Sequence, residues 1–390
     1  MHGGLQITPL SSYLSVVVFA GGSLACSAAP TMPALIATRA LQGIGGSGLV
    51  VTAISALGEM FDRDELVRRQ IWLTTVTAIS AIAGPPIGGF LAAGPGWRWI
   101  FLVNLPICAV AIALAIQGLP RQDRRVALSG FDWFGAALIA TIGTGVVTLG
   151  SSASVASSPL WAPLILAAVF LGTIWFVRVE RRAASPLIPL DLFSNRPLAR
   201  TIAVTGLTGM TLFGTYTFVS LAAATVAGAN TGMVGTLLLA LTGGQLAVTT
   251  AFSFVARRFP RMTAWGGLGL VLGVAGLVLL AAVPLLRDAR FVATALAVGG
   301  MALTGAALGL SMQAYTLFAQ TIAPRDSFGA AMGTLTFSRQ LGGSLGTAAF
   351  GWILLTVTPK NVALAVVLWA AALITGVSGL VAPRETGGGG

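Results

Sequence analysis

Apolar stretches alternate with short polar connections along the whole chain, and each stretch is long enough to cross a membrane. A helix of about 20 apolar residues spans the hydrocarbon core of a bilayer and satisfies its own backbone hydrogen bonds there. Membrane-spanning helices are therefore predicted over residues 13–29, 33–58, 70–93, 98–118, 131–150, 160–179, 198–226, 231–255, 264–286, 291–319, 328–356 and 360–382. The pattern predicts an all-α, polytopic membrane protein with about twelve transmembrane helices.

Composition agrees with this pattern, since 56% of the residues are hydrophobic and 8% are charged. The net charge of +11 is unevenly placed: alternate connections hold sixteen arginines, and the connections between them hold four basic residues. Basic residues gather on the cytoplasmic side of membrane proteins, so both termini are predicted to be cytoplasmic. The basic residues thus indicate how the chain is oriented in the membrane. Nucleic-acid binding is not expected, because the sequence contains no soluble module with a basic face.

Several kinds of reactive site are excluded by composition. Cys26 and Cys108 both lie in predicted spans, and His2 and Lys360 are the single histidine and lysine. These residues build neither a disulfide framework nor a metal site, and there is no Ser–His pair or phosphate loop with lysine. We therefore expect no enzyme activity and no cofactor.

A polar segment at 178–200, with three prolines, separates six predicted spans from six more. Aligning Gly48 with Gly309 places "EMFDRDE" over "TIAPRDS", and offsets of 261 to 262 persist across two helices. This indicates an internal repeat, as transporters often have, although chance similarity in Gly/Ala-rich sequence is an alternative. If the halves are equivalent, the front half lacks its first two helices and spans 131–150 and 160–179 are an insertion. The predicted organisation is a four-helix N-terminal bundle (1–126), an insertion with a linker (127–196), and a six-helix C-terminal bundle with a tail (197–390).

Span 33–58 carries "LIATRALQGIGGSG", in which Arg39, Gln42, Gly43 and Gly46 share one helix face. A guanidinium within a span must face protein or water because it keeps its proton. We expect Arg39 and Gln42 to face a cavity or to take part in proton coupling. The alternative is that Arg39 extends outward to the lipid headgroups.

Span 70–93 carries "SAIAGPPIGGF", whose candidate residues are Gly84, Pro85, Pro86, Gly88 and Gly89. Gly84 and Gly88 form a GxxxG pair that would allow a neighbouring helix to approach closely. The two prolines delete backbone donors and bend a helix. Together they indicate a shaped bend at a helix interface.

Two further strings contain polar residues within spans. "GWRWIFLVNLPI" (96–107) begins with interfacial tryptophans and continues to Asn104. "FSRQLGGSLGTA" is expected to bury Arg339 and Gln340 roughly 16 Å from the cytoplasmic end of span 328–356. Arg339 is the deepest charge in the chain, which makes it a functional candidate.

Taken together, these strings resemble the major facilitator superfamily, specifically its 14-helix drug:proton antiporter branch. "RALQGIGG" resembles the arginine motif of that family's fourth helix, "AGPPIGG" the antiporter motif of its fifth, and "GWRWIFLVNLPI" the entry to its sixth. "FDWFGAAL", "PLIPLDLF" and "SRQLGGSLG" resemble later elements. The resemblance implies a two-bundle, proton-driven exporter with a central cavity, in which the helix of Arg39 is linked to proton coupling and the antiporter motif seals the resting state.

The chain also departs from the family pattern. The family's first two helices have no counterpart, so the N-terminal bundle is expected to be incomplete. No carboxylate lies in mid-span, since Glu59 and Asp132 are at helix ends and the other acids are in connections. Proton coupling usually needs a titratable carboxylate in the membrane.

The leading hypothesis is a bacterial inner-membrane exporter of hydrophobic or amphipathic small molecules, driven by the proton gradient and acting as a monomer. Alternatives are a truncated or inactive transporter fragment and an uptake carrier of the same fold. The expected partners are the substrate and membrane lipid. Polar residues that could line the cavity, or else bond between helices, are Asn104, Tyr216, Gln245, Gln313 and Tyr315.

Overall fold

The structure is a computed structural model of the chain. It describes residues 9–61, 94–118, 132–151, 158, 160–182, 188–226, 231–256, 258–259, 261–285, 290–324 and 327–383, with scattered positions from Glu65 to Leu91.

Helices form nearly all of the described chain, and no strand occurs in these residues. Their bounds are α1 (Pro9–Ala28), α2 (Met32–Met60), α4 (Trp99–Leu102), α5 (Asn104–Gly118), α6 (Trp133–Ser151), α8 (Trp161–Glu180), α9 (Arg196–Val226), α10 (Thr231–Val255), α11 (Met262–Ala282), α12 (Arg290–Ile322), α13 (Phe328–Thr356) and α14 (Lys360–Val381). A short 3-10 turn, η2 (Leu190–Ser194), precedes α9, and another, η3 (Val283–Leu285), follows α11.

The predicted spans agree with these helices in place and type. Within the described residues, seven helices are long and apolar enough to cross a membrane, and α1 and α6 contain shorter apolar segments. The all-α, polytopic fold class is confirmed. Span 98–118 is interrupted at Val103, between α4 and α5, while most of span 70–93 lies outside the described residues.

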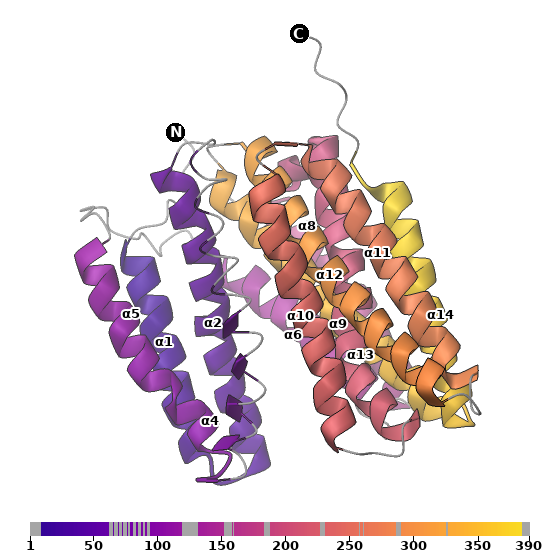
Figure 1. Cartoon of the computed structure of the whole chain (residues 1–390). Helices are drawn as coiled ribbons and strands as arrows, with labels where there is room; N and C mark the ends of the chain where they lie inside the picture. The colour runs from indigo at the N-terminus through magenta and orange to yellow at the C-terminus, as the bar shows by residue number, and fades with distance from the viewer. Residues whose placement is uncertain are drawn as a thin grey trace. The chain divides into compact units, whose positions relative to one another are not determined.

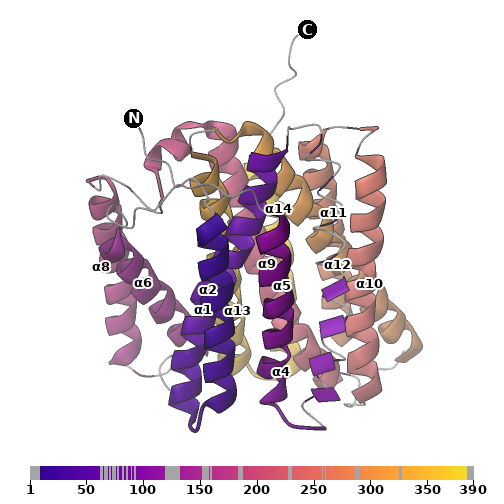
Figure 2. The same cartoon turned by 90° about the vertical axis from the view of Figure 1, so that its left-hand side faces the viewer.

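The chain forms two compact units. The first contains Met1–Arg69, Ile79–Gly130 and Pro324–Gly333, and the second contains Gln70–Ala78, Phe131–Ala323 and Thr334–Gly390. Within the first unit, α1 packs against both α2 and α5 and lies between them in the view of Figure 1. Figure 2 shows the same three helices from the side. The second unit contains α6, α8 and the helices from α9 onward, with all but the first turns of α13.

Glycines let α1 and α2 approach closely. A Cβ added at Gly22 would lie 2.6 Å from the Cα of Gln42, and one added at Gly45 would lie 2.6 Å from the Cα of Phe19. No side chain fits at these distances, so the glycines set the separation of the two helices. The tight pairing fixes Gln42 against α1.

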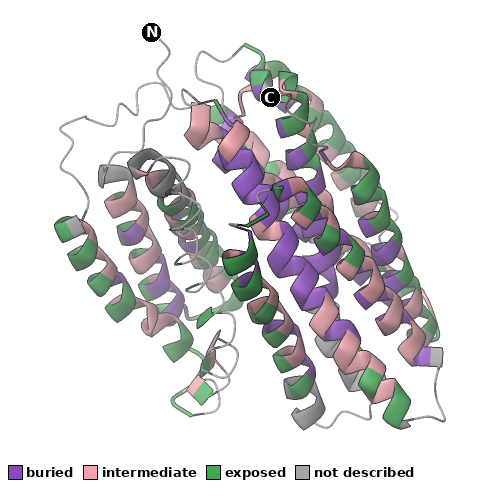
Figure 3. Ribbon diagram, turned by 45° about the horizontal axis from the view of Figure 1, so that its top comes forward, coloured by how far each residue is buried: buried purple, intermediate pink, exposed green. Residues whose placement is uncertain are grey.

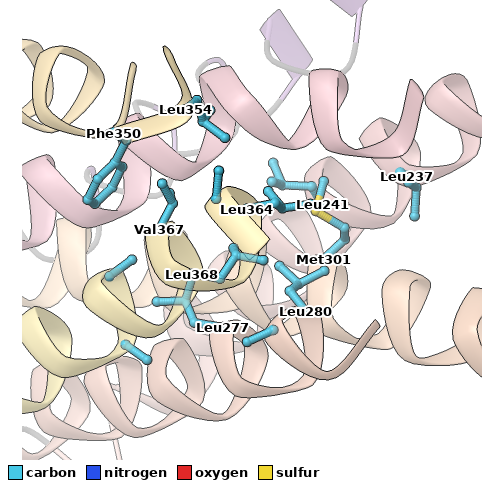
Figure 4. Packing of buried hydrophobic residues seen from close by; sticks show 14 residues of the cluster. Leu237, Leu241, Leu277, Leu280, Met301, Phe350, Leu354, Leu364, Val367 and Leu368 are labelled. Carbon is cyan, nitrogen blue, oxygen red and sulfur yellow. The ribbon is translucent and has the colours of Figure 1, made fainter. Parts of the chain in front are cut away.

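The second unit has a continuous apolar core built from five helices. Leu241 of α10, Leu277 of α11, Met301 of α12, Phe350 of α13 and Val367 of α14 all contribute to it, and each is at most 2% exposed (Figure 4). Figure 3 shows the buried residues along the inner helices of this unit and exposed residues on the outward faces. This core holds the polar side chains of α12 and α13 in place.

The ends of α2 and α12 agree with the internal repeat. These helices end at Met60 and Ile322, which the predicted offset of 262 residues aligns. The two sequences therefore have matching helix ends as well as similar residues.

Helices α6 and α8 pack against each other. Their contact includes an edge-to-face pair between Phe134 and Trp175, with ring centroids 5.2 Å apart. The side chain of Asp132 accepts a hydrogen bond from the backbone N–H of Gly135 at 2.8 Å, so it caps the start of α6. The outward apolar side chains of this pair, such as Trp161 and Phe170, suit a lipid environment.

The described residues supply no neighbouring helix at Gly84 and Gly88. A Cβ added at either residue meets no atom within 4 Å in the part of the chain that the structure describes. The prediction of a close helix contact at this GxxxG pair stays a prediction, because most of span 70–93 lies outside the described residues. Pro85, Pro86 and Gly89 of the same motif lie outside the described residues.

Candidate functional site

A polar network joins α1, α2 and α5 in the first unit. The guanidinium of Arg39 donates from Nη1 to Oε1 of Gln42 at 2.7 Å. The amide of Gln42 donates from Nε2 to Oγ of Ser23 at 2.7 Å, and Nδ2 of Asn104 also donates to this oxygen, at 3.4 Å. The thiol of Cys26 lies 3.9 Å from Oε1 of Gln42. The structure thus brings Arg39, Gln42 and Asn104 together.

Exposure changes sharply along this network. Gln42 is 4% exposed and Ser23 is fully buried, whereas Arg39 is exposed. The guanidinium carbon of Arg39 lies 5.6 Å from the centroid of the Phe101 ring, within cation–π range. The guanidinium of Arg39 is therefore held at the edge of a series of buried, neutral, hydrogen-bonded side chains. These side chains orient the charge but leave it partly accessible to solvent.

Ser23 is the residue on which this network converges, and sequence reasoning missed it. A single serine in an apolar span has no signal of its own, because spans contain many serines and threonines that bond to their own helix. Ser23 became identifiable only when α1 was placed against α2 and α5.

Replacing Ser23 with Ala is expected to destabilise the first unit. The change leaves the buried amide donor of Gln42 without its acceptor, which costs about 1–3 kcal/mol. The measurement is the thermal unfolding midpoint of the purified protein in detergent, which should fall. Ser47→Ala is the matched control, because Oγ of exposed Ser47 bonds to the Ile44 carbonyl of its own helix. Equal midpoints for both variants would show that the network does not stabilise the fold.

A second polar group lies in the second unit. Arg339 of α13 is 8% exposed, and its Nη2 donates to Oγ1 of Thr316 on α12 at 2.8 Å. The next residue, Gln340, is exposed. Arg339 is thus buried among neighbouring side chains whereas Gln340 is not, because adjacent residues of a helix point about 100° apart. That both lie deep within a membrane span stays a prediction.

Glycines bring α9 against this part of α13. A Cβ added at Gly209 would clash with the carbonyl oxygen of Arg339, and one added at Gly206 would lie 2.7 Å from Oγ of Ser338. Oγ of Ser338 also donates to the carbonyl of Ile202 at 3.0 Å. The backbone of α13 at Arg339 therefore packs directly against α9, which limits where the guanidinium lies.

The remaining candidate residues are dispersed. Tyr315 is fully buried in an apolar cluster with Val204 and Leu270, and Gln313 is partly buried on the same helix. Gln245 lies on α10 and is also partly buried. It packs against Gly309, because a Cβ added at Gly309 would lie 3.1 Å from Cγ of Gln245. Tyr216 lies in α9, and its side chain is outside the described set.

The two polar groups lie among long apolar helices, and comparison with known proteins decides the family. The family model for the Major Facilitator Superfamily matches residues 12–347. The chain belongs to the major facilitator superfamily. The resemblance that the sequence motifs indicate is thereby confirmed.

Relatives within the major facilitator superfamily include named drug transporters. The chain is 31% identical to the uncharacterised MFS-type transporter Rv1877 of Mycobacterium tuberculosis, over 86% of this chain and 48% of that protein. It is 26% identical to the multidrug transporter protein MdtP of Bacillus subtilis, over 87% and 62%. It is 30% identical to the multidrug resistance protein B homolog of M. tuberculosis, over 87% and 63%. The chain thus spans about half to two thirds of the length of these relatives.

A solved structure of the superfamily has the same fold. The chain superposes on the human organic anion transporter MFSD10 with a TM-score of 0.64 and 13% sequence identity. The match covers 95% of this chain and 76% of the other. At this identity the comparison supports the fold alone.

Proposed function

We propose that the protein is a secondary transporter that exports hydrophobic or amphipathic small molecules in exchange for protons. The observation that carries the proposal is the network around Arg39. In a superfamily of transporters, it holds one charged side chain at the edge of a buried, hydrogen-bonded chain formed by three helices. The names of the multidrug relatives support export.

The proposed transport mechanism is alternating access. Two helix bundles that rock about a central site expose it to one side of the membrane at a time. Each unit here has its own polar group, Arg39 with Gln42 and Ser23 in the first and Arg339 with Thr316 in the second. Such groups orient the substrate, while the apolar helices around them exclude water. The energy comes from the proton gradient, and the protein needs no bound cofactor.

The distribution of arginine supports a topology with both termini in the cytoplasm, and the bacterial relatives support a location in a bacterial inner membrane. Sixteen arginines in the connections assigned to the cytoplasm, against four basic residues opposite, give a strong bias of the kind that orients membrane proteins. We propose that the chain acts as a monomer in contact with lipid.

An accumulation assay tests the proposed direction of transport. An efflux-deficient bacterium expressing the chain is loaded with ethidium, N-phenyl-1-naphthylamine or fluorescein, which are a cation, a neutral compound and an anion. Export predicts lower accumulation of at least one compound than in cells with an empty vector, and a protonophore should abolish the difference. Higher accumulation would indicate an uptake carrier, and no difference for any compound would refute the proposal.

A further inference from the structure

The C-terminal helices bury a positive charge for which they provide no negative partner. Arg339 is 8% exposed, and the sequences of α9 to α14 contain neither Asp nor Glu. No ion pair of the described residues includes Arg339. Its bond to Thr316 is to a neutral hydroxyl. A guanidinium keeps its proton in proteins, and a buried charge without a partner is costly.

A second buried side chain, on the same helix as Thr316, is also unsatisfied. Gln320 is 3% exposed, and neither atom of its amide has a hydrogen-bond partner in the described part of the chain. It lies one helical turn from Thr316, so both residues share a face of α12. Nε of Arg339 likewise has no partner there. Buried polar groups are normally hydrogen-bonded, so three such atoms in one region call for an explanation.

Ordinary helix chemistry does not explain this cluster. Several buried threonines of the C-terminal helices bond to the carbonyl four residues earlier, as Thr208, Thr304 and Thr375 do. A glutamine amide or a guanidinium nitrogen has no such local solution in these positions. Two of the three atoms, Nε of Arg339 and Nε2 of Gln320, are donors. For these donors a group with negative charge and acceptor oxygens is missing, and a carboxylate has both.

The surroundings of the cluster become apolar in one direction. Met312, one turn from Thr316 on the side away from Gln320, packs on a buried cluster that includes Leu212 and Leu308. A ligand with its charged group at Arg339 would therefore have apolar side chains beside the rest of its body. This arrangement suits an amphipathic organic anion better than a small inorganic ion.

We propose that Arg339, Thr316 and Gln320 form the binding site for the carboxylate of an amphipathic organic acid. The proposal rests on the proposed transport function, to which it adds the charge of the substrate. It also accounts for the lack of acidic residues in α9 to α14, because the negative charge arrives with the substrate. Arg339 is the residue that selects the anion, and Gln320 donates a hydrogen bond to it.

A matched pair of ligands tests the site without any transport step. The full chain, purified in a neutral detergent, is titrated calorimetrically at neutral pH with 4-pentylbenzoate and with its uncharged amide, 4-pentylbenzamide. The carboxylate should bind about tenfold more tightly or better, since charge-assisted hydrogen bonds are roughly twice as strong as neutral ones. Equal affinities in the wild-type protein would overturn the proposal.

Variants assign the preference to a residue. Arg339→Gln should bring the two affinities together, whereas Arg339→Lys, which keeps the charge, should retain part of the preference. Arg178→Gln is the control, because it removes an exposed arginine at the end of α8 and should change nothing. A wild-type preference that persists in Arg339→Gln would place the anion elsewhere and overturn the proposal. If Arg339→Gln does not fold, Arg339→Lys is compared with Arg178→Gln instead. An equally large preference for the carboxylate in both variants would also overturn the proposal, because the ammonium of lysine lacks the bidentate geometry of arginine.

A lipid phosphate would satisfy the same groups, so the titration is repeated with phosphatidylglycerol in the micelles. Unchanged carboxylate affinity supports a substrate site, and displacement would assign the site to a headgroup and overturn the substrate assignment. Because no gradient is present, carboxylate binding in a protein that fails the accumulation assay would refute the export proposal alone. Export without a carboxylate preference would refute this inference alone.

Discussion

Replacing Arg39 with Ala is expected to abolish proton-driven efflux while leaving the amount of protein in the membrane unchanged. The variant removes the one charge of the network and leaves Oε1 of Gln42 without the guanidinium donor at 2.7 Å. Because Arg39 itself is exposed, its loss opens no buried cavity, so folding should be preserved. The measurement is the initial rate of dye efflux from energised cells, normalised to the protein present.

Two further variants make this result specific. Arg39→Lys keeps a positive charge but loses the planar group that bonds Gln42 and faces Phe101, and we expect a reduced rate rather than none. Arg178→Ala removes an exposed arginine outside both polar groups and should transport at the wild-type rate. A wild-type rate in Arg39→Ala would contradict the role assigned to the network.

Replacing Gly342 with Leu is expected to prevent the second unit from folding. A Cβ at this position would meet the carbonyl oxygen of Gly206 and would lie 3.1 Å from the backbone nitrogen of Met210. Both contacts are with the backbone of α9, which cannot move aside as a side chain could. Overpacking of a core costs about 1–3 kcal/mol even where side chains can adjust, and more is expected here. Fluorescence size-exclusion of detergent extracts should show little or no monodisperse protein.

The matched control is Gly376→Leu on α14. Gly376 is exposed, and a Cβ there meets nothing within 4 Å. This variant should elute like the wild type, and it should gain helix propensity because glycine is poor in helix interiors. A Gly342→Leu protein as abundant and monodisperse as Gly376→Leu would show that α9 and α13 are not in close contact.

The fold was predictable because long apolar stretches leave a chain few alternatives in a membrane. The helix bounds followed from where hydrophobicity ends, and the burial of Arg339 followed from its depth within a span. Gly84 and Gly88 show where such reasoning stops. A GxxxG spacing says that a helix could approach but does not place the partner. Gly342 and Gly346 have this spacing, and an added Cβ at either would clash with the backbone of α9, whereas at Gly84 and Gly88 it meets no described atom.

The two polar groups were predictable only in part. Arg39 and Gln42 share a helix face, so their contact could be expected from the sequence. Ser23 and Thr316, which accept hydrogen bonds from Gln42 and Arg339, lie 19 and 23 residues from those partners along the chain. No local pattern links such positions, because the link is made by the packing of two helices. Gln320 was missed for the same reason.

The exchange of protons for substrate is the central claim, and everted membrane vesicles test it most directly. Respiration acidifies the vesicle interior, and the fluorescence of a quenched acridine dye reports the gradient as ethidium, N-phenyl-1-naphthylamine or fluorescein is added. Vesicles with the wild-type chain should release protons on addition of at least one compound, and vesicles with Arg39→Ala, which correct for passive permeation, should not. Identical traces from both kinds of vesicle for all three compounds would contradict the proton-coupled export proposed for this protein.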